Sequence, residues 1–173
     1  APSILNSDIF GASVQIPYYK VISANKDLTV TPRLFFDNNF LIQTEYRQAN
    51  KNSDTIVDLG LNRDNNNSKS HFFSNISGSS EKVNFDINLQ KISNDNYLKL
   101  YKVKSPLIKS TSTLNSFITI DKSGEDYSID TSIEVFEDLT KEDSDKFEYV
   151  YPSYSFSKDL DNSNKLNGKL DFK

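Results

Sequence analysis

Residues 82–91 read KVNFDINLQK, and this stretch decides the fold class. Apolar and polar residues alternate along it without interruption. The apolar row is Val83, Phe85, Ile87 and Leu89, and the polar row is Lys82, Asn84, Asp86, Asn88 and Gln90. Successive side chains of a β-strand point to opposite faces of the sheet. This period of two therefore predicts a strand with one apolar face and one polar face.

The same alternation continues on both sides of this stretch. Residues 27–36 and 40–48 precede it, and residues 113–120 and 127–135 follow it. The segments between these runs are rich in Asn, Asp, Ser and Lys, which favour turns. Helix is expected only within residues 95–101, where a turn or two fits. We therefore predict an all-β protein, an antiparallel meander of about nine or ten strands.

Alternation of this kind is compatible with two environments. In a soluble sandwich the apolar rows form a dry core, whereas in an outer-membrane barrel they face lipid and the polar rows line a hydrated lumen. Three features favour the barrel: long strands, aromatic residues near the predicted strand ends, and polar rows dense in amides and charges. On these features, we predict an outer-membrane β-barrel rather than a sandwich.

Composition excludes several classes of protein. A formal net charge of −4 and a pI near 5.0 argue against nucleic-acid binding, which favours a basic surface. The absence of Cys excludes disulfides and thiolate metal sites. The chain of 173 residues has no Met and no signal-peptide pattern at its start. We therefore expect a mature chain or an internal fragment.

The sequence offers no catalytic constellation. His71 is the only histidine, and we interpret it as a surface or strand-end residue. The acidic stretch 137–148 lacks the order of a calcium loop. A facing pair such as Glu45 and Asp58 carries little weight, because the chain has 24 acidic residues and such pairs arise by chance. We expect no enzyme activity, no cofactor and no metal site.

The segment GASVQIPYYKVISANKDLTVTPRLFFDNNFLIQTEYRQ, residues 11–48, resembles the start of the barrel domain in the LPS-assembly protein (LptD) family of Gram-negative outer membranes. The shared motifs are Pro17-Tyr18-Tyr19, the segment 24–32 ending in Thr31-Pro32, and Glu45-Tyr46-Arg47. Residues 92–101, ISNDNYLKLY, are similar to a further family segment. One departure is Ala24, where the family often has Pro.

The resemblance implies a domain organisation, a location and partners. Residues 1–10 would end a linker from a periplasmic jellyroll absent from this chain. Residues 11–173 would form the first part of the transmembrane barrel, truncated at the C-terminus, so that the fold would be a partial, unclosed outer-membrane β-barrel. The protein would lie in the cell outer membrane of a Gram-negative bacterium. Its partners would be lipopolysaccharide, outer-membrane lipids, the plug lipoprotein LptE and, through the jellyroll, the periplasmic bridge protein LptA.

The resemblance also implies site residues. Pro17 and Pro32 would lie on the first and second barrel strands, where each removes an N–H donor, and with Tyr18 and Tyr19 they would form a lateral gate for lipopolysaccharide. The candidates for the lumen are Gln43, Glu45, Arg47, Lys82, Asn84, Asp86, Asn88 and Gln90. The candidates for lipid contact are Val83, Phe85, Ile87 and Leu89.

Two other classes remain open on the sequence. One is a soluble all-β carbohydrate-binding or adhesin-like domain with a dry apolar core. The other is a β-sandwich hydrolase, which would carry paired carboxylates with displaced pKa values in a cleft.

Overall fold

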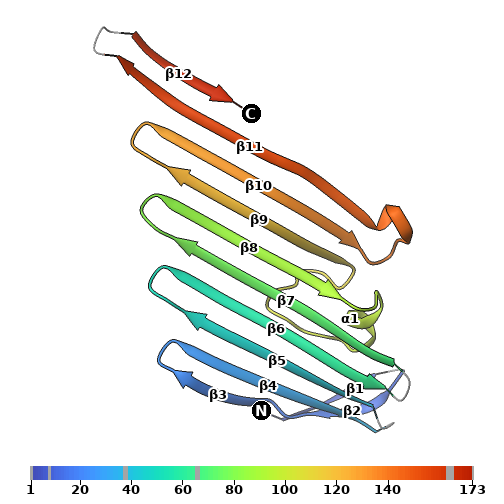
Figure 1. Cartoon of the computed structure of the whole chain (residues 1–173). Helices are drawn as coiled ribbons and strands as arrows, with labels where there is room; N and C mark the ends of the chain where they lie inside the picture. Colours follow the sequence, from blue (N-terminus) through green and yellow to red (C-terminus); the bar gives the residue numbers. More distant parts are fainter. Residues whose placement is uncertain (1, 8, 37–38, 65–66, 163–165, 173) are drawn as a thin grey trace.

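The computed structural model describes residues 2–7, 9–36, 39–64, 67–162 and 166–172. Most of them belong to a single antiparallel sheet whose order follows the chain (Figure 1). Its strands are β1 (Ser3–Ser7), β2 (Gly11–Gln15), β3 (Tyr18–Ser23), β4 (Lys26–Phe35), β5 (Phe40–Ala49), β6 (Ser53–Asp64), β7 (Asn67–Ser79), β8 (Val83–Ile92), β9 (Thr113–Ser123), β10 (Tyr127–Asp138), β11 (Phe147–Asn162) and β12 (Leu166–Phe172).

The predicted all-β antiparallel meander is confirmed, and the sheet does not close into a barrel. Its first and last strands lie at opposite ends of the sheet (Figure 1). The described residues form twelve strands rather than the nine or ten predicted. One extra strand arises because the predicted first strand is divided into β2 and β3. The other, β1, lies within residues 1–10, which we expected to be linker, and pairs with β2.

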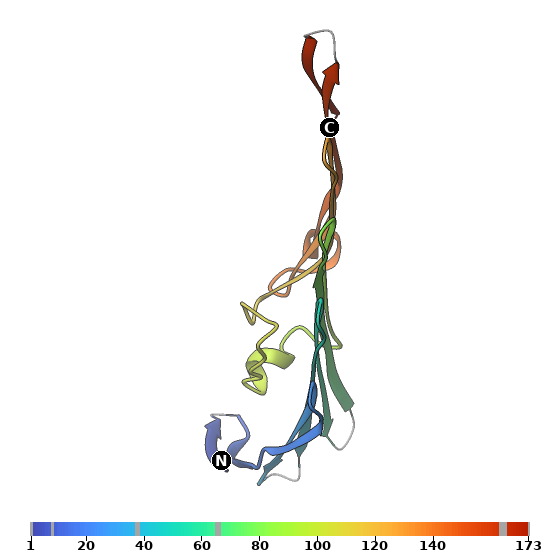
Figure 2. The ribbon, with the colours of Figure 1, turned by 90° about the vertical axis from the view of Figure 1, so that its left-hand side faces the viewer.

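The strand register sorts the side chains onto two faces. One face, here called the polar face, carries Gln43, Asp58 and Asn88. The opposite face, called the apolar face, carries Ile42, Leu61 and Ile118. Many side chains of the apolar face are exposed, including Leu61 at 48% and Ile118 at 40%. Viewed along the sheet, the described strands from β4 to β12 form a single layer, and the β1–β2 hairpin curls to one side of it (Figure 2). The apolar face therefore has no covering layer among these residues.

The covered face is the polar one. The connection from β8 to β9, residues 93–112, contains the short helix α1 (Tyr97–Leu100), as expected for residues 95–101. This connection and the β1–β2 hairpin lie on the same side of the sheet (Figure 2). No helix among the described residues is long and apolar enough to cross a membrane.

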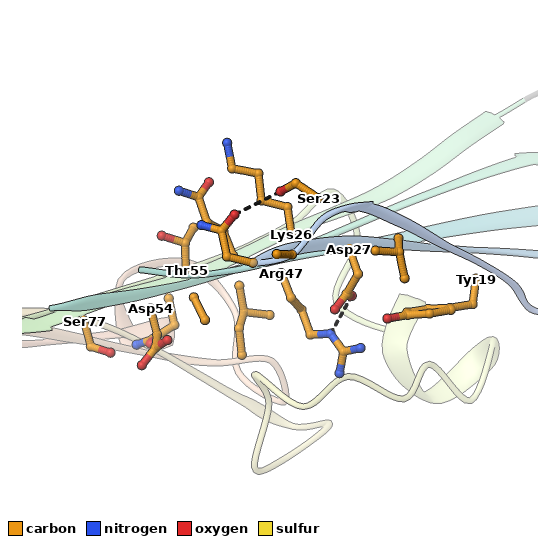
Figure 3. A pocket seen from close by; sticks show the side chains of 15 residues that line it. Tyr19, Ser23, Lys26, Asp27, Arg47, Asp54, Thr55 and Ser77 are labelled. Atoms are coloured by element: carbon orange, nitrogen blue, oxygen red, sulfur yellow. Dashed lines mark hydrogen bonds and ion pairs between the residues drawn. The ribbon is translucent and has the colours of Figure 1, made fainter. Parts of the chain in front are cut away.

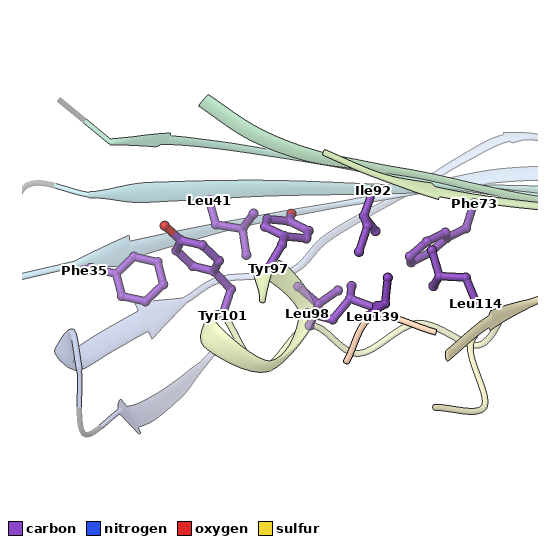
Figure 4. Packing of buried hydrophobic residues seen from close by; sticks show 10 residues of the cluster. Phe35, Leu41, Phe73, Ile92, Tyr97, Leu98, Tyr101, Leu114 and Leu139 are labelled. Carbon is purple, nitrogen blue, oxygen red and sulfur yellow. The ribbon is translucent and has the colours of Figure 1, made fainter. Parts of the chain in front are cut away.

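The hydrophobic core lies between this connection and the sheet (Figure 4). Tyr97, Leu98 and Tyr101 are fully buried against strand residues such as Leu41 and Phe73. Phe10, after β1, stacks on Tyr101 with ring centroids 5.0 Å apart. The core is therefore local: it fastens the connection and the hairpin to the polar face and leaves the apolar face free.

A second link fastens the connection to the far part of the sheet. Lys146 belongs to a short 3-10 helix, η1 (Asp143–Lys146), between β10 and β11. Its Nζ lies 2.6 Å from Asp95 Oδ1 and 2.8 Å from Glu137 Oε1. These hydrogen bonds, to Asp95 first and Glu137 second, raise the pKa of Lys146. The ammonium group thus joins the start of the connection to β10.

Candidate functional site

The first feature of the site is a break in the strand that pairs with β4, at a position where a proline lies on each of the two strands. β2 and β3 lie along the same side of β4 and are separated by Ile16 and Pro17. Gln15 pairs with Arg33 and Tyr18 with Val30, so the register is unchanged across the break. In this register Ile16 opposes Pro32, and Pro17 opposes Thr31. The two prolines therefore occupy neighbouring steps of one ladder.

The two prolines remove backbone donors on different sides of the interrupted strand. Pro32 removes a donor of β4 that would face this strand, and Pro17 removes a donor at its outer edge. The N–H of Ile16 donates to the Pro32 carbonyl at 3.1 Å, and Pro32 has no N–H to return a bond. Neighbouring residues of a strand direct their N–H groups to opposite sides, so the nitrogen of Pro17 points to the outer edge. There β1 pairs with β2 as far as the Ser3–Gln15 step, while β3 has no outer partner among the described strands.

The two tyrosines after Pro17 are exposed on opposite faces. Tyr18, 66% exposed, pairs with Val30 of the apolar row, and Tyr19 pairs with Thr29 of the polar row. Tyr19 lines a cavity of about 670 Å³ at the β3–β4 end of the sheet (Figure 3). In that cavity Arg47 Nε donates to Asp27 Oδ1 at 2.9 Å.

Buried polar groups under the 93–112 connection form the second feature. Gln43 Nε2 donates to both oxygens of Asp58, at 3.1 and 2.9 Å, and to the Lys104 carbonyl at 2.8 Å. His71 Nε2 lies 3.3 Å from Asp58 Oδ1, and Nδ1 lies 3.1 Å from the Tyr97 hydroxyl. Asp58 is 0% and His71 3% exposed. Burial, with the charge of Asp58 adding, raises the pKa of Tyr97.

Gly60 makes this arrangement possible. A Cβ at this position would lie 2.2 Å from His71 Cε1 and 2.7 Å from the Tyr97 hydroxyl. Any larger residue would therefore displace the histidine or the helix. The absence of a side chain lets the ring of His71 lie over the backbone of β6, and the ring stacks on Phe73 at a centroid distance of 4.5 Å.

Our interpretation of His71 as a surface or strand-end residue is wrong, because the connection covers it. Glu45 and Asp58, dismissed as a chance pair, are direct cross-strand partners, and Asp58 belongs to the buried network. The strand register places Asp58 and His71 on the polar face. What the sequence did not indicate is that residues 93–112 fold back over that row.

The other residues predicted to form the site are positioned by the register. The strand members of the predicted polar set lie on the polar face, whereas Lys82 lies in the exposed turn before β8. Gln90 Nε2 donates to the Leu107 carbonyl at 2.6 Å, and Asn88 Nδ2 donates to the Asn115 carbonyl at 2.6 Å. On the apolar face lie Val83, Phe85, Ile87 and Leu89. Within the described ranges, no group of three or more His, Cys, Asp or Glu residues could hold a metal ion.

Together these features define a class: an open antiparallel meander with an exposed apolar face, a covered polar face and an interrupted strand at one end. No family model matches the chain. Over 110 residues the chain is 31% identical to the LPS-assembly protein LptD of Pseudoalteromonas translucida (strain TAC 125), which confirms the resemblance inferred from the motifs. The matched segment covers 56% of this chain and 14% of that protein.

Proposed function

We propose that this chain forms part of the barrel wall and lateral gate of a lipopolysaccharide translocon in the outer membrane of a Gram-negative bacterium. The similarity to LptD supports a role in LPS assembly. The observation that carries the finer proposal is the paired interruption at Pro17 and Pro32, beside a strand edge that has no partner among the described residues.

The two faces support a membrane setting for this wall. Burial of apolar surface is worth about 25 cal/mol per Å², so an uncovered apolar face is unfavourable in water and favourable against lipid. Val83, Phe85, Ile87 and Leu89 would then contact outer-membrane lipids. The polar face would meet the hydrated interior of the barrel, where sugars and phosphates of lipopolysaccharide pass.

The gate would open at the strand edge beside Pro17. A net backbone hydrogen bond is worth about 1 kcal/mol, so two missing donors weaken two successive ladders by a modest amount. A seam weakened in this way separates sideways more readily than an intact one, and acyl chains leave through it into the outer leaflet. Tyr18 and Tyr19 would flank the passing lipid.

The remaining partners follow from the resemblance. Residues 11–173 would be the first part of the barrel, and residues 1–10 would lead from a jellyroll that receives lipopolysaccharide from LptA. The plug lipoprotein LptE would fill part of the hydrated interior. Contacts with LptE or sugars are proposed for the accessible members of the polar set, Glu45, Arg47, Lys82, Asn84 and Asp86. The process is transport and needs no catalytic residue.

The test replaces both prolines in the full-length protein, expressed as the sole copy in a Gram-negative host. Pro17→Ala with Pro32→Ala restores both donors and should lower outer-leaflet lipopolysaccharide, measured with a surface-restricted antibody. The matched control is Pro152→Ala, which changes a proline within β11, far from the proposed seam. Normal surface lipopolysaccharide in the double variant, at normal protein levels, would contradict the gate.

A further inference from the structure

A second cavity lies beneath the β1–β2 hairpin, with a volume of about 560 Å³. Three parts of the chain line it: the hairpin, the polar face of β4 and β5, and the end of the 93–112 connection. Pro17 is among the lining residues, so the cavity adjoins the interruption of the first strand. The residues used below, all of which line it, are Arg33, Gln43, Glu45, Tyr101, Lys102 and Lys104.

Arg33 is buried in the wall of this cavity with an unused donor. It is 4% exposed. Its Nε donates to Ser13 Oγ at 2.9 Å, and its Nη1 donates to the Tyr101 carbonyl at 2.5 Å. Among the described residues, Nη2 has no hydrogen-bond partner and no carboxylate forms an ion pair with the guanidinium group. A buried charge is costly unless it is paired, so this arrangement favours an external anion.

Positive side chains outnumber negative ones in the lining of this cavity. The cavity lining carries three cations, Arg33, Lys102 and Lys104, and one carboxylate, Glu45, which makes a formal charge of +2. Glu45 is itself 3.5 Å from the Arg47 guanidinium. Lys102 Nζ donates to the Asn6 carbonyl at 3.1 Å, which uses one of its three donors.

The arrangement suits a phosphate group. Guanidinium and ammonium groups attract phosphate and form charge-assisted hydrogen bonds with its oxygens, whereas the Gln43 amide at the rim is already used by Asp58 and the Lys104 carbonyl. We propose that this cavity is a phosphate site in which the ammonium groups of Lys102 and Lys104 hold the anion and the unpaired charge of the buried Arg33 guanidinium group attracts it. Free phosphate and the phosphate of a glycolipid head group share this chemistry. The glycolipid as source rests on the proposed function, whereas the phosphate site does not.

The experiment is a binding titration of the full-length protein in detergent. The probes are inorganic phosphate, followed by ³¹P NMR, and micelles of a diphosphorylated glucosamine glycolipid or its dephosphorylated form. The test variants are Arg33→Gln and the double variant Lys102→Gln, Lys104→Gln. The second variant retains the buried guanidinium, so it remains informative if Arg33→Gln does not fold. The matched control is Lys51→Gln with Lys141→Gln, two exposed lysines in turns outside the cavity.

We expect Arg33→Gln to weaken phosphate binding about tenfold, or about 1.4 kcal/mol, because it removes the unpaired buried charge beside the anion. The lysine pair should weaken it several-fold and the control should leave it unchanged. Glu45→Gln should strengthen it. Equal binding by the wild type and the lysine pair, or no phosphate binding by the wild type, would overturn the site.

The probes also identify the source of the anion. Tighter binding of the diphosphorylated than of the dephosphorylated glycolipid assigns the site to the lipid head group, and binding of phosphate alone assigns it to the free ion. The Pro17→Ala, Pro32→Ala variant separates this inference from the gate. Normal surface lipopolysaccharide in that variant would contradict only the gate, whereas equal phosphate binding by the wild type and the lysine pair would contradict only the phosphate site.

Discussion

The backbone N–H of Ile16 donates to the carbonyl of Pro32, 3.1 Å away, and Pro32 has no N–H with which to complete the pair. The interrupted strand is therefore held to β4 by half of the usual bonds at this step. Pro17, one residue on, lacks a donor on the opposite side. Pro32 thus weakens the pairing of the interrupted strand with β4, whereas Pro17 weakens the outer edge of that strand.

Replacing Pro32 alone should strengthen the inner ladder. Pro32→Ala supplies an N–H facing the Ile16 carbonyl, and a net bond of about 1 kcal/mol should slow hydrogen exchange of the Ile16 amide several-fold. Hydrogen exchange with mass spectrometry of the full-length protein measures this effect. Pro17→Ala is the control, since its new N–H points to the outer edge. A larger slowing in Pro17→Ala than in Pro32→Ala would contradict the register.

The exposed apolar face predicts an asymmetry between neighbouring substitutions. Ile118→Lys places a charge on the apolar face, which costs about 2–4 kcal/mol near the middle of a bilayer and should impair assembly. Thr119→Lys, on the polar face, should assemble normally. The folded fraction of the full-length protein can be measured by heat-modifiable migration in electrophoresis. Equal assembly of both variants, together with a compact monomer in buffer without detergent, would favour the soluble carbohydrate-binding class instead.

Gly60→Ala should loosen the connection over the polar face. The added methyl group cannot fit beside His71 and Tyr97, so one of the two must move. We expect faster proteolysis within residues 93–112, which limited digestion and mass spectrometry can locate. Leu61→Ala changes the adjacent residue on the apolar face and serves as the control. Proteolysis at the wild-type rate in Gly60→Ala would show that the space tolerates a methyl group.

Tyr97→Phe tests the same contact more gently. It removes the hydroxyl that lies 3.1 Å from His71 Nδ1 and leaves the buried ring in place. The expected loss is about 1 kcal/mol of local stability, seen as several-fold faster exchange of amides in 93–112. Tyr149→Phe removes an exposed hydroxyl and should change nothing. Unchanged exchange in Tyr97→Phe would mean that ring packing alone holds the connection.

Lys146→Gln should free the start of the connection from β10, because it removes the ammonium group shared by Asp95 and Glu137. The pKa of Lys146 is raised, so its contribution is complete below the ordinary lysine pKa and is lost only as the pH rises through the higher value. The effect on proteolysis at residues 93–96 should therefore be equal at about pH 6 and about pH 9. Lys141→Gln, an exposed lysine 3.9 Å from Asp138, is the control.

The sequence predicted which residues form strands and which face of the sheet their side chains occupy, because both depend on local periodicity. Residues 82–91 place Phe85 and Asn88 on opposite faces in any register that keeps them in a strand. The break at Pro17 was less predictable. Proline signals a lost donor, but whether a strand bends, ends or continues beyond it depends on its neighbours, and here the ladder resumes in the same register at Tyr18.

The sequence by itself determined that the chain is an antiparallel meander with one apolar row, because side-chain direction alternates with every residue. Only the tertiary structure decided which row is covered. The 93–112 connection folds over the polar face, since Tyr97, Leu98 and Tyr101 pack against Phe35, Leu41 and Phe73, which lie on β4, β5 and β7, far away in the chain. Those contacts bury His71, surround Arg33 and leave the apolar row exposed, and no local pattern encodes them.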